Sequence, residues 1–177
     1  MSTYRIYGAY HWTNKFNSNT DNEILLKNHA TPVVMKEIVS RVEKYAKQVL
    51  SDNKIKIQYN RLRASAGGFI FDTISNRIRK ADAIIFDITE CNPNVMLELG
   101  IALEANRNSE ASKIFLLHEG DDFSKIKMPS DLKGFYLSLY TFQNGKVILK
   151  DAQSIVMRLT SEIMEKNNLS YYEDENI

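Results

Sequence analysis

The sequence predicts a single α/β domain in which helices cover both faces of a mostly parallel sheet. Strand-like runs alternate along the chain with segments of helical periodicity, and this alternation is typical of parallel sheets with crossover helices. Residues 83–86 (AIIF) are apolar without interruption, as in a strand buried on both faces. The length of 177 residues and the apolar fraction of 44% suit one globular domain.

The N-terminal half contains two predicted strands, each followed by a helix. Residues 4–10 are aromatic and β-branched, and residues 55–59 alternate between apolar and polar. A long polar segment, residues 11–31, precedes a helix that begins at Pro32, because proline suits a first helical turn. Loops of that length are often functional. The inner face of this helix is expected to carry Val34, Ile38, Val42, Tyr45 and Val49.

The next helix, over residues 69–80, is expected to place Ile70, Ile74 and Ile78 inward. The C-terminal half then continues the alternation. We expect it to contain the strand at residues 83–86, a helix from Val95 to about residue 105, strands over 113–118 and 135–142, and a helix over 151–166.

This order predicts a doubly wound, five-stranded sheet of the flavodoxin-like or Rossmann-like kind. Residues 1–169 are expected to form the domain, and residues 170–177 a flexible acidic tail.

Composition excludes several classes of function. The formal net charge of +1 gives no electrostatic footprint for nucleic acid or an anionic membrane. The single cysteine, Cys91, indicates a reducing compartment, and no secretory or membrane-spanning segment is visible, so we expect a cytoplasmic protein. Three histidines, His11, His29 and His118, lack the spacing of zinc ligands, so neither a metal nor a cofactor is expected.

One carboxylate, Glu98, stands in a helix whose other residues from 95 to 103 are apolar or glycine. A helix that is apolar all round is normally buried, and a buried carboxylate is costly unless it is paired or functional. Asn94 is the expected N-cap, which places Glu98 in the first turn or just beyond it, where the helix dipole favours an ionised nucleophile. Alternatively, Glu98 complements the dipole at a solvated edge or pairs with Arg61 or Arg63.

Ligands of open parallel sheets bind at the carboxyl ends of the strands. The first strand ends at Gly8, Ala9 and Tyr10, and the buried strand ends at Asp87. Trp12 follows the first strand and, with Tyr10, offers a stacking surface for a base; packing in the core is the alternative.

The segment from residue 81 to 103, ADAIIFDITECNPNVMLELGIAL, resembles the signature of the nucleoside 2-deoxyribosyltransferases and their TIR-like relatives. In these proteins a strand ending in Asp-Leu-Thr precedes Asn-Pro-Asn-Val-x-x-Glu-Leu-Gly-x-Ala. Residues 5–10, RIYGAY, are similar to the first strand of the deoxyribosyltransferases.

The resemblance implies chemistry at an N-glycosidic bond. Glu98 matches the family's nucleophile, and Tyr7 matches a tyrosine that orients it, although Tyr7 also reads as a core aromatic. Asp72 falls near a base-binding aspartate, and Asp87 is implied to bind sugar hydroxyls or the base, or to cap its loop. At Asn92 the deoxyribosyltransferases often carry an aspartate that handles the leaving base. This difference favours the TIR-like branch, whose members cleave or bind nucleotides such as NAD.

The substrate-binding candidates are therefore Gly8, Ala9, Tyr10, Trp12, Asp72, Asn92 and Asn94, and the catalytic candidates are Glu98, Tyr7 and Asp87. The expected ligand is a small nucleoside or nucleotide. The alternative function is a TIR-like module that cleaves NAD or binds a signal nucleotide, with a role in bacterial antiviral defence. Both families commonly oligomerise, so the resemblance also implies a homo-oligomer.

Overall fold

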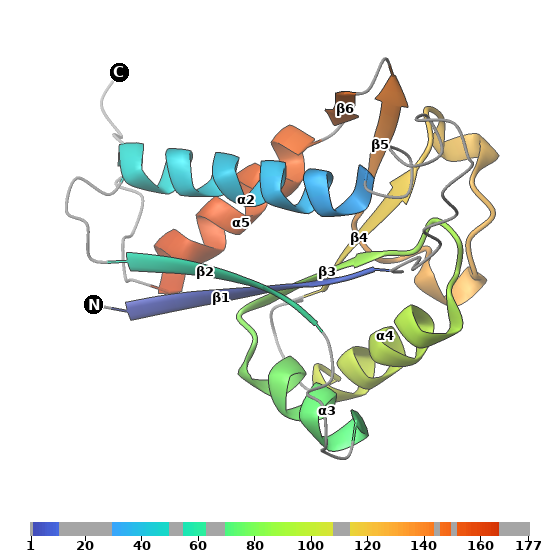
Figure 1. Cartoon of the computed structure of the whole chain (residues 1–177), viewed down its shortest axis with the longest axis horizontal. Coiled ribbons are helices and arrows are strands. Elements are labelled where there is room, and N and C mark those ends of the chain that lie inside the picture. The colour runs from blue at the N-terminus through green and yellow to red at the C-terminus, as the bar shows by residue number, and fades with distance from the viewer. Residues whose placement is uncertain are drawn as a thin grey trace, which may run out of the picture.

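A computed structural model describes residues 2–10, 30–49, 55–62, 70–107, 114–143, 146–149 and 152–166. These residues form one six-stranded sheet with the strand order β2-β1-β3-β4-β5-β6 (Figure 1). The strands are β1 (Ser2–Ala9), β2 (Ile55–Arg61), β3 (Ala83–Asp87), β4 (Ile114–Glu119), β5 (Leu137–Gln143) and β6 (Lys146–Leu149). Neighbouring strands from β2 to β5 pair in parallel, and the whole is a Rossmann-like α/β fold.

The predicted count of five strands is wrong, because β6 adds a sixth. It pairs antiparallel with β5, with Thr141 opposite Ile148 and Tyr140 opposite Leu149. The sequence carried a signal for this hairpin, since Asn144-Gly145 between two apolar runs is typical of a two-residue β-turn. An edge strand of four residues is too short to show a clear alternating pattern.

Helices lie on both faces of the sheet, as predicted. They are α2 (Ala30–Val49), α3 (Ile70–Lys80), α4 (Pro93–Ala105) and α5 (Ala152–Lys166). Figure 1 shows α2 and α5 over one face and α3 and α4 over the other. Pro32 lies in the first turn of α2, as its missing N–H allows, although the helix begins two residues earlier.

The sheet separates two apolar cores. All five residues of β3 are buried, which confirms that this strand is covered on both faces. On the α2 and α5 side, Val34, Ile38 and Val42 are buried with residues of α5, whereas Val49 at the end of the predicted stripe is 51% exposed. On the α3 and α4 side, the core includes Ile74, Ile78, Ile84, Phe86, Val95 and Leu99.

The strand order creates a switch point between β1 and β3. From β1 the chain crosses to β2 on one side, and from β3 it crosses to β4 on the other, so the connections leave the carboxyl ends of β1 and β3 in opposite directions. Ligands of doubly wound sheets bind in the crevice at such a point. Helix α4 begins six residues after β3 ends and therefore stands beside it. None of the helices in the described part of the chain has the length and apolar character needed to cross a bilayer.

Candidate active site

Helix α4 begins earlier than the sequence suggests. Asn92 is its N-cap, and the Asn92 side-chain oxygen accepts hydrogen bonds from the N–H groups of Asn94 at 3.0 Å and Val95 at 3.5 Å. The prediction of Asn94 as the cap is wrong because Pro93 occupies the first helical position, where its fixed φ is suitable. Asn94 is exposed. Glu98 therefore lies in the second turn of the helix, just beyond the first.

The helix is also less buried than its composition suggests. Val95, Leu99 and Ala102 are buried, but Leu97 is 59% exposed. Gly100 is exposed as well, and a Cβ atom there would meet nothing within 4 Å. One side of α4 packs on the sheet, and an apolar side faces outward.

Glu98 is half-buried at the boundary between these two sides. Burial raises the pKa of Glu98 from 4.5 to about 7, and the positive charge of Arg61 opposes that rise. No hydrogen bond or ion pair joins Glu98 to another described residue. In the second turn the helix dipole is weaker than at the first, so desolvation outweighs the ionising influence expected from the sequence.

Arg61 connects three elements at the carboxyl edge of the sheet. It is the last residue of β2, and its guanidinium lies 4.8 Å from the centroid of the Tyr10 ring, just after β1. Its Nη2 donates a hydrogen bond of 3.5 Å to the Tyr10 carbonyl oxygen. Arg61 also acts electrostatically on Glu98, but no ion pair joins the two side chains, so the predicted pairing of Glu98 with Arg61 is not found. Arg63, the alternative partner, lies outside the described residues.

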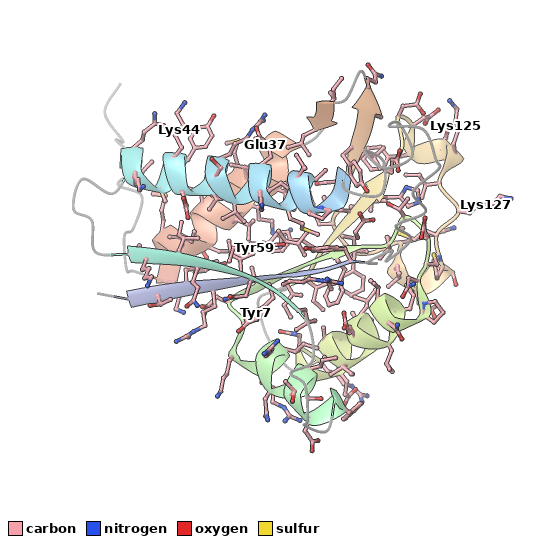
Figure 2. All side chains as sticks on the ribbon, viewed as in Figure 1. Tyr7, Glu37, Lys44, Tyr59, Lys125 and Lys127 are labelled. Carbon is pink, nitrogen blue, oxygen red and sulfur yellow. The ribbon has the colours of Figure 1, made fainter. Side chains whose placement is uncertain are left out.

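Gly8 makes room for the ring of Tyr59. A Cβ atom on Gly8 would lie 2.4 Å from the Tyr59 hydroxyl oxygen. Burial raises the pKa of Tyr59, and the neighbouring Tyr10 phenol adds to the effect, although the two hydroxyls form no well-aligned hydrogen bond. Figure 2 places Tyr59 on the α2 side of the sheet. Ala9 is fully buried in the core on the opposite side.

Asp87 is buried at the end of β3 and joins three strands. Its Oδ1 accepts hydrogen bonds from the backbone N–H of Thr89 at 3.0 Å and from the Thr89 hydroxyl, and its Oδ2 accepts one from the Tyr140 hydroxyl at 2.7 Å. The Thr89 hydroxyl oxygen in turn accepts the N–H of Glu119 at 2.8 Å. Asp87 therefore links β3 directly to β5 through Tyr140, and to β4 through the Thr89 hydroxyl. This agrees with the loop-capping alternative.

Tyr7 lies on the other face of the sheet from Tyr59 (Figure 2). It packs against the α3 and α4 core and lines a hollow of about 530 Å³ beside β2. Among the described residues, no hydrogen bond joins Tyr7 to Glu98. The core-aromatic alternative therefore describes the position of Tyr7, and its role in orienting Glu98 stays a prediction.

The remaining predicted residues are dispersed. Asp72 is exposed in the first turn of α3, where a carboxylate complements the helix dipole. Trp12 lies outside the described residues, as does the acidic tail. Within the part of the chain that the structure describes, no three histidine, cysteine, aspartate or glutamate side chains gather as metal ligands do.

Tyr59 and Tyr140 also lie in this region, but the sequence did not identify either of them as a site residue. Each phenol is largely buried, and a buried tyrosine hydroxyl normally needs a partner. Their position on alternating strands predicted burial. The partner of the Tyr140 hydroxyl, Asp87, comes from another strand, and the Tyr59 hydroxyl makes no hydrogen bond to a described residue.

No protein-family model matches the sequence, and no curated protein is significantly similar to it. The family resemblance therefore depends on the motif residues alone.

Proposed function

We propose that the protein cleaves or transfers at the N-glycosidic bond of a nucleoside or nucleotide, with Glu98 as the nucleophile. One observation supports this most strongly. A half-buried carboxylate with a raised pKa stands on an apolar helix beside the topological switch point, and the guanidinium of Arg61 acts on it electrostatically. Perturbed carboxylates in such positions are typical of functional sites.

The chemistry needs the ionised form of Glu98. A carboxylate oxygen attacks the anomeric carbon, and the C–N bond breaks with its electron pair leaving on the base. Water or a second base then attacks the same carbon and releases the carboxylate. With a pKa of about 7, a substantial fraction of Glu98 is ionised at neutral pH, and Arg61 favours that fraction.

The alternative is a TIR-like module that cleaves NAD or binds a signal nucleotide. The observation that favours it concerns Asn92. This position carries an amide whose oxygen caps α4, and so lacks the carboxylic acid that would handle a departing base in deoxyribosyltransferases. A binding module would retain its ligand unchanged, whereas an enzyme would consume it.

The test is chromatography of purified full-length protein incubated with nucleosides, deoxynucleotides and NAD. Glu98→Gln is the diagnostic variant because it keeps the shape and removes the nucleophile. Glu104→Gln is the matched control, since Glu104 is exposed on the same helix and interacts with Arg107 at 3.9 Å. Circular dichroism establishes that all three proteins are folded.

Release of a free base by wild type and Glu104→Gln, but not by Glu98→Gln, is the expected result. Equal release by Glu98→Gln would refute the nucleophile. Saturable binding without product would favour the signal-nucleotide module. Repeating the assay over a range of protein concentrations tests whether turnover depends on the homo-oligomer that the resemblance implies.

A further inference from the structure

A polar hollow of about 530 Å³ lies on the sheet beside the edge strand β2. Its lining comes from β1, β2 and α3, and consists of Tyr7, Gln58, Tyr59, Asn60, Arg61 and Arg77. Two of these residues are arginines, two are amides and none is a carboxylate. Among the residues that the structure describes, the lining thus carries a formal charge of +2 together with further hydrogen-bond donors.

The strand register explains why Tyr7, Gln58 and Asn60 share one face of the sheet. Tyr59 and Arg61 alternate with them along β2, and they border the hollow from the opposite face of this edge strand. Tyr7 of β1 is directly opposite Asn60 of β2, and side chains two residues apart on a strand project to the same face, so Gln58 and Asn60 lie together. Helix α3 covers this face and contributes Arg77 from its last turn. A cation is favourable there because the carboxyl end of a helix carries partial negative charge.

Arg61 relates the hollow to the candidate active site. It belongs to the lining of the hollow and also acts electrostatically on Glu98. A ligand held in the hollow would therefore lie next to the charge that influences the carboxylate.

From this arrangement we propose that the hollow binds the phosphate group of a nucleotide substrate. Guanidinium groups and amide N–H groups are the donors that proteins use for phosphate oxygens, and arginine can engage two of them at once. A phosphate and the Glu98 carboxylate would repel each other in a half-buried site, and Arg61, which lines the hollow and acts on Glu98, reduces that repulsion. The inference rests on the proposed function for the identity of the substrate, and it narrows that substrate to a phosphorylated one.

Binding is tested in the full-length Glu98→Gln variant, where turnover cannot consume the ligand. Titration calorimetry compares adenosine 5′-monophosphate and deoxyadenosine 5′-monophosphate with their parent nucleosides, and the other common bases follow in the same pairs. NAD and inorganic phosphate complete the panel. We expect at least one monophosphate to bind roughly tenfold or more tightly than its nucleoside.

Arg77→Gln, added to this background, is expected to weaken binding of the monophosphate roughly 10- to 100-fold and to leave nucleoside binding unchanged. Arg79→Gln is the matched control, because Arg79 lies two residues along α3, is exposed and does not line the hollow. Thermal unfolding of both variants establishes that the helix is intact.

Three results would overturn the proposal. The first is equal affinity for nucleosides and monophosphates, or no saturable binding of any anion in the panel. The second is an equal loss of affinity in Arg77→Gln and Arg79→Gln. The third is inorganic phosphate bound as tightly as every nucleotide, which would assign the hollow to the free ion. Because binding is read without turnover, a wild type that binds nucleotides through Arg77 but releases no base would refute the glycosidic chemistry and leave the phosphate site standing.

Discussion

Replacing Glu98 with glutamine should stabilise the protein at neutral and alkaline pH while abolishing turnover. The folded chain keeps the carboxyl protonated up to about pH 7, whereas in the unfolded chain it ionises near its ordinary pKa of 4.5. A group whose pKa is raised by folding contributes stability that is fully present below the unfolded pKa and is lost as the pH rises through the folded one. Glutamine cannot ionise, so the stability of the variant does not fall in this way as the pH rises.

The size of the effect follows from the two pKa values. Each pKa unit is worth about 1.4 kcal/mol, so the rise from 4.5 to about 7 sets an upper bound of about 3–4 kcal/mol. Because Glu98 is only half-buried and solvent screens its charge, we expect roughly 1–2 kcal/mol at about pH 8. Near pH 4 the wild type and the variant should differ by much less, since both side chains are then mostly neutral.

Urea unfolding of wild type, Glu98→Gln and Glu104→Gln at several pH values measures this directly. The free energy of unfolding of Glu98→Gln, relative to wild type, should rise between about pH 4.5 and pH 7 and then level off. Glu104→Gln should run parallel to wild type throughout, because Glu104 is exposed. A Glu98→Gln curve that is also parallel to wild type would refute the burial argument.

Substitutions at three further positions test the packing and capping around the site by urea unfolding. Gly8→Ala should cost roughly 1–3 kcal/mol, because its Cβ would lie 2.4 Å from the Tyr59 hydroxyl oxygen; unchanged stability would mean that this ring moves freely. Tyr140→Phe should cost roughly 1–3 kcal/mol, because it removes the donor to Asp87 Oδ2 from a buried site; a neutral result would contradict that hydrogen bond. Asn92→Ala should cost about 1 kcal/mol through loss of the cap of α4, whereas Asn92→Asp should stay near wild type. Equal losses in the two Asn92 variants would argue against capping.

Much of the fold could be predicted because its signals are local. The uninterrupted apolar run of β3 indicated a strand covered on both faces, and the periodicity of α2 identified most of its buried side. The start of α4 was misplaced by two residues because the sequence offers two asparagines as caps, and only Pro93 between them distinguishes the first from the second. Val49 shows a different limit of periodicity. The apolar pattern continues to the end of α2, but the core beneath the helix ends before Val49, which is therefore exposed.

The candidate site was only partly predictable because its contacts join distant segments. Glu98 stood out as a lone carboxylate among apolar residues, which is a local signal. The hydrogen bond between Tyr140 and Asp87 spans 53 residues and depends on how β5 aligns with β4, which no short pattern specifies. The choice between Arg61 and Arg63 as the cation near Glu98 likewise depends on where β2 ends.

The position of Arg61 explains how one positive charge can act both on the Glu98 carboxylate and on a phosphate in the hollow. Burial alone would drive Glu98 towards its neutral form, in which it is a poor nucleophile, and Arg61 is the charge that opposes this. Arg61 is held there by the Tyr10 ring and carbonyl rather than by a close ion pair with Glu98. A tight pair would bind the carboxylate and hinder its attack on carbon. A cation positioned by β1 can favour ionisation while leaving the carboxylate oxygens available, and it can also attract a phosphate into the hollow.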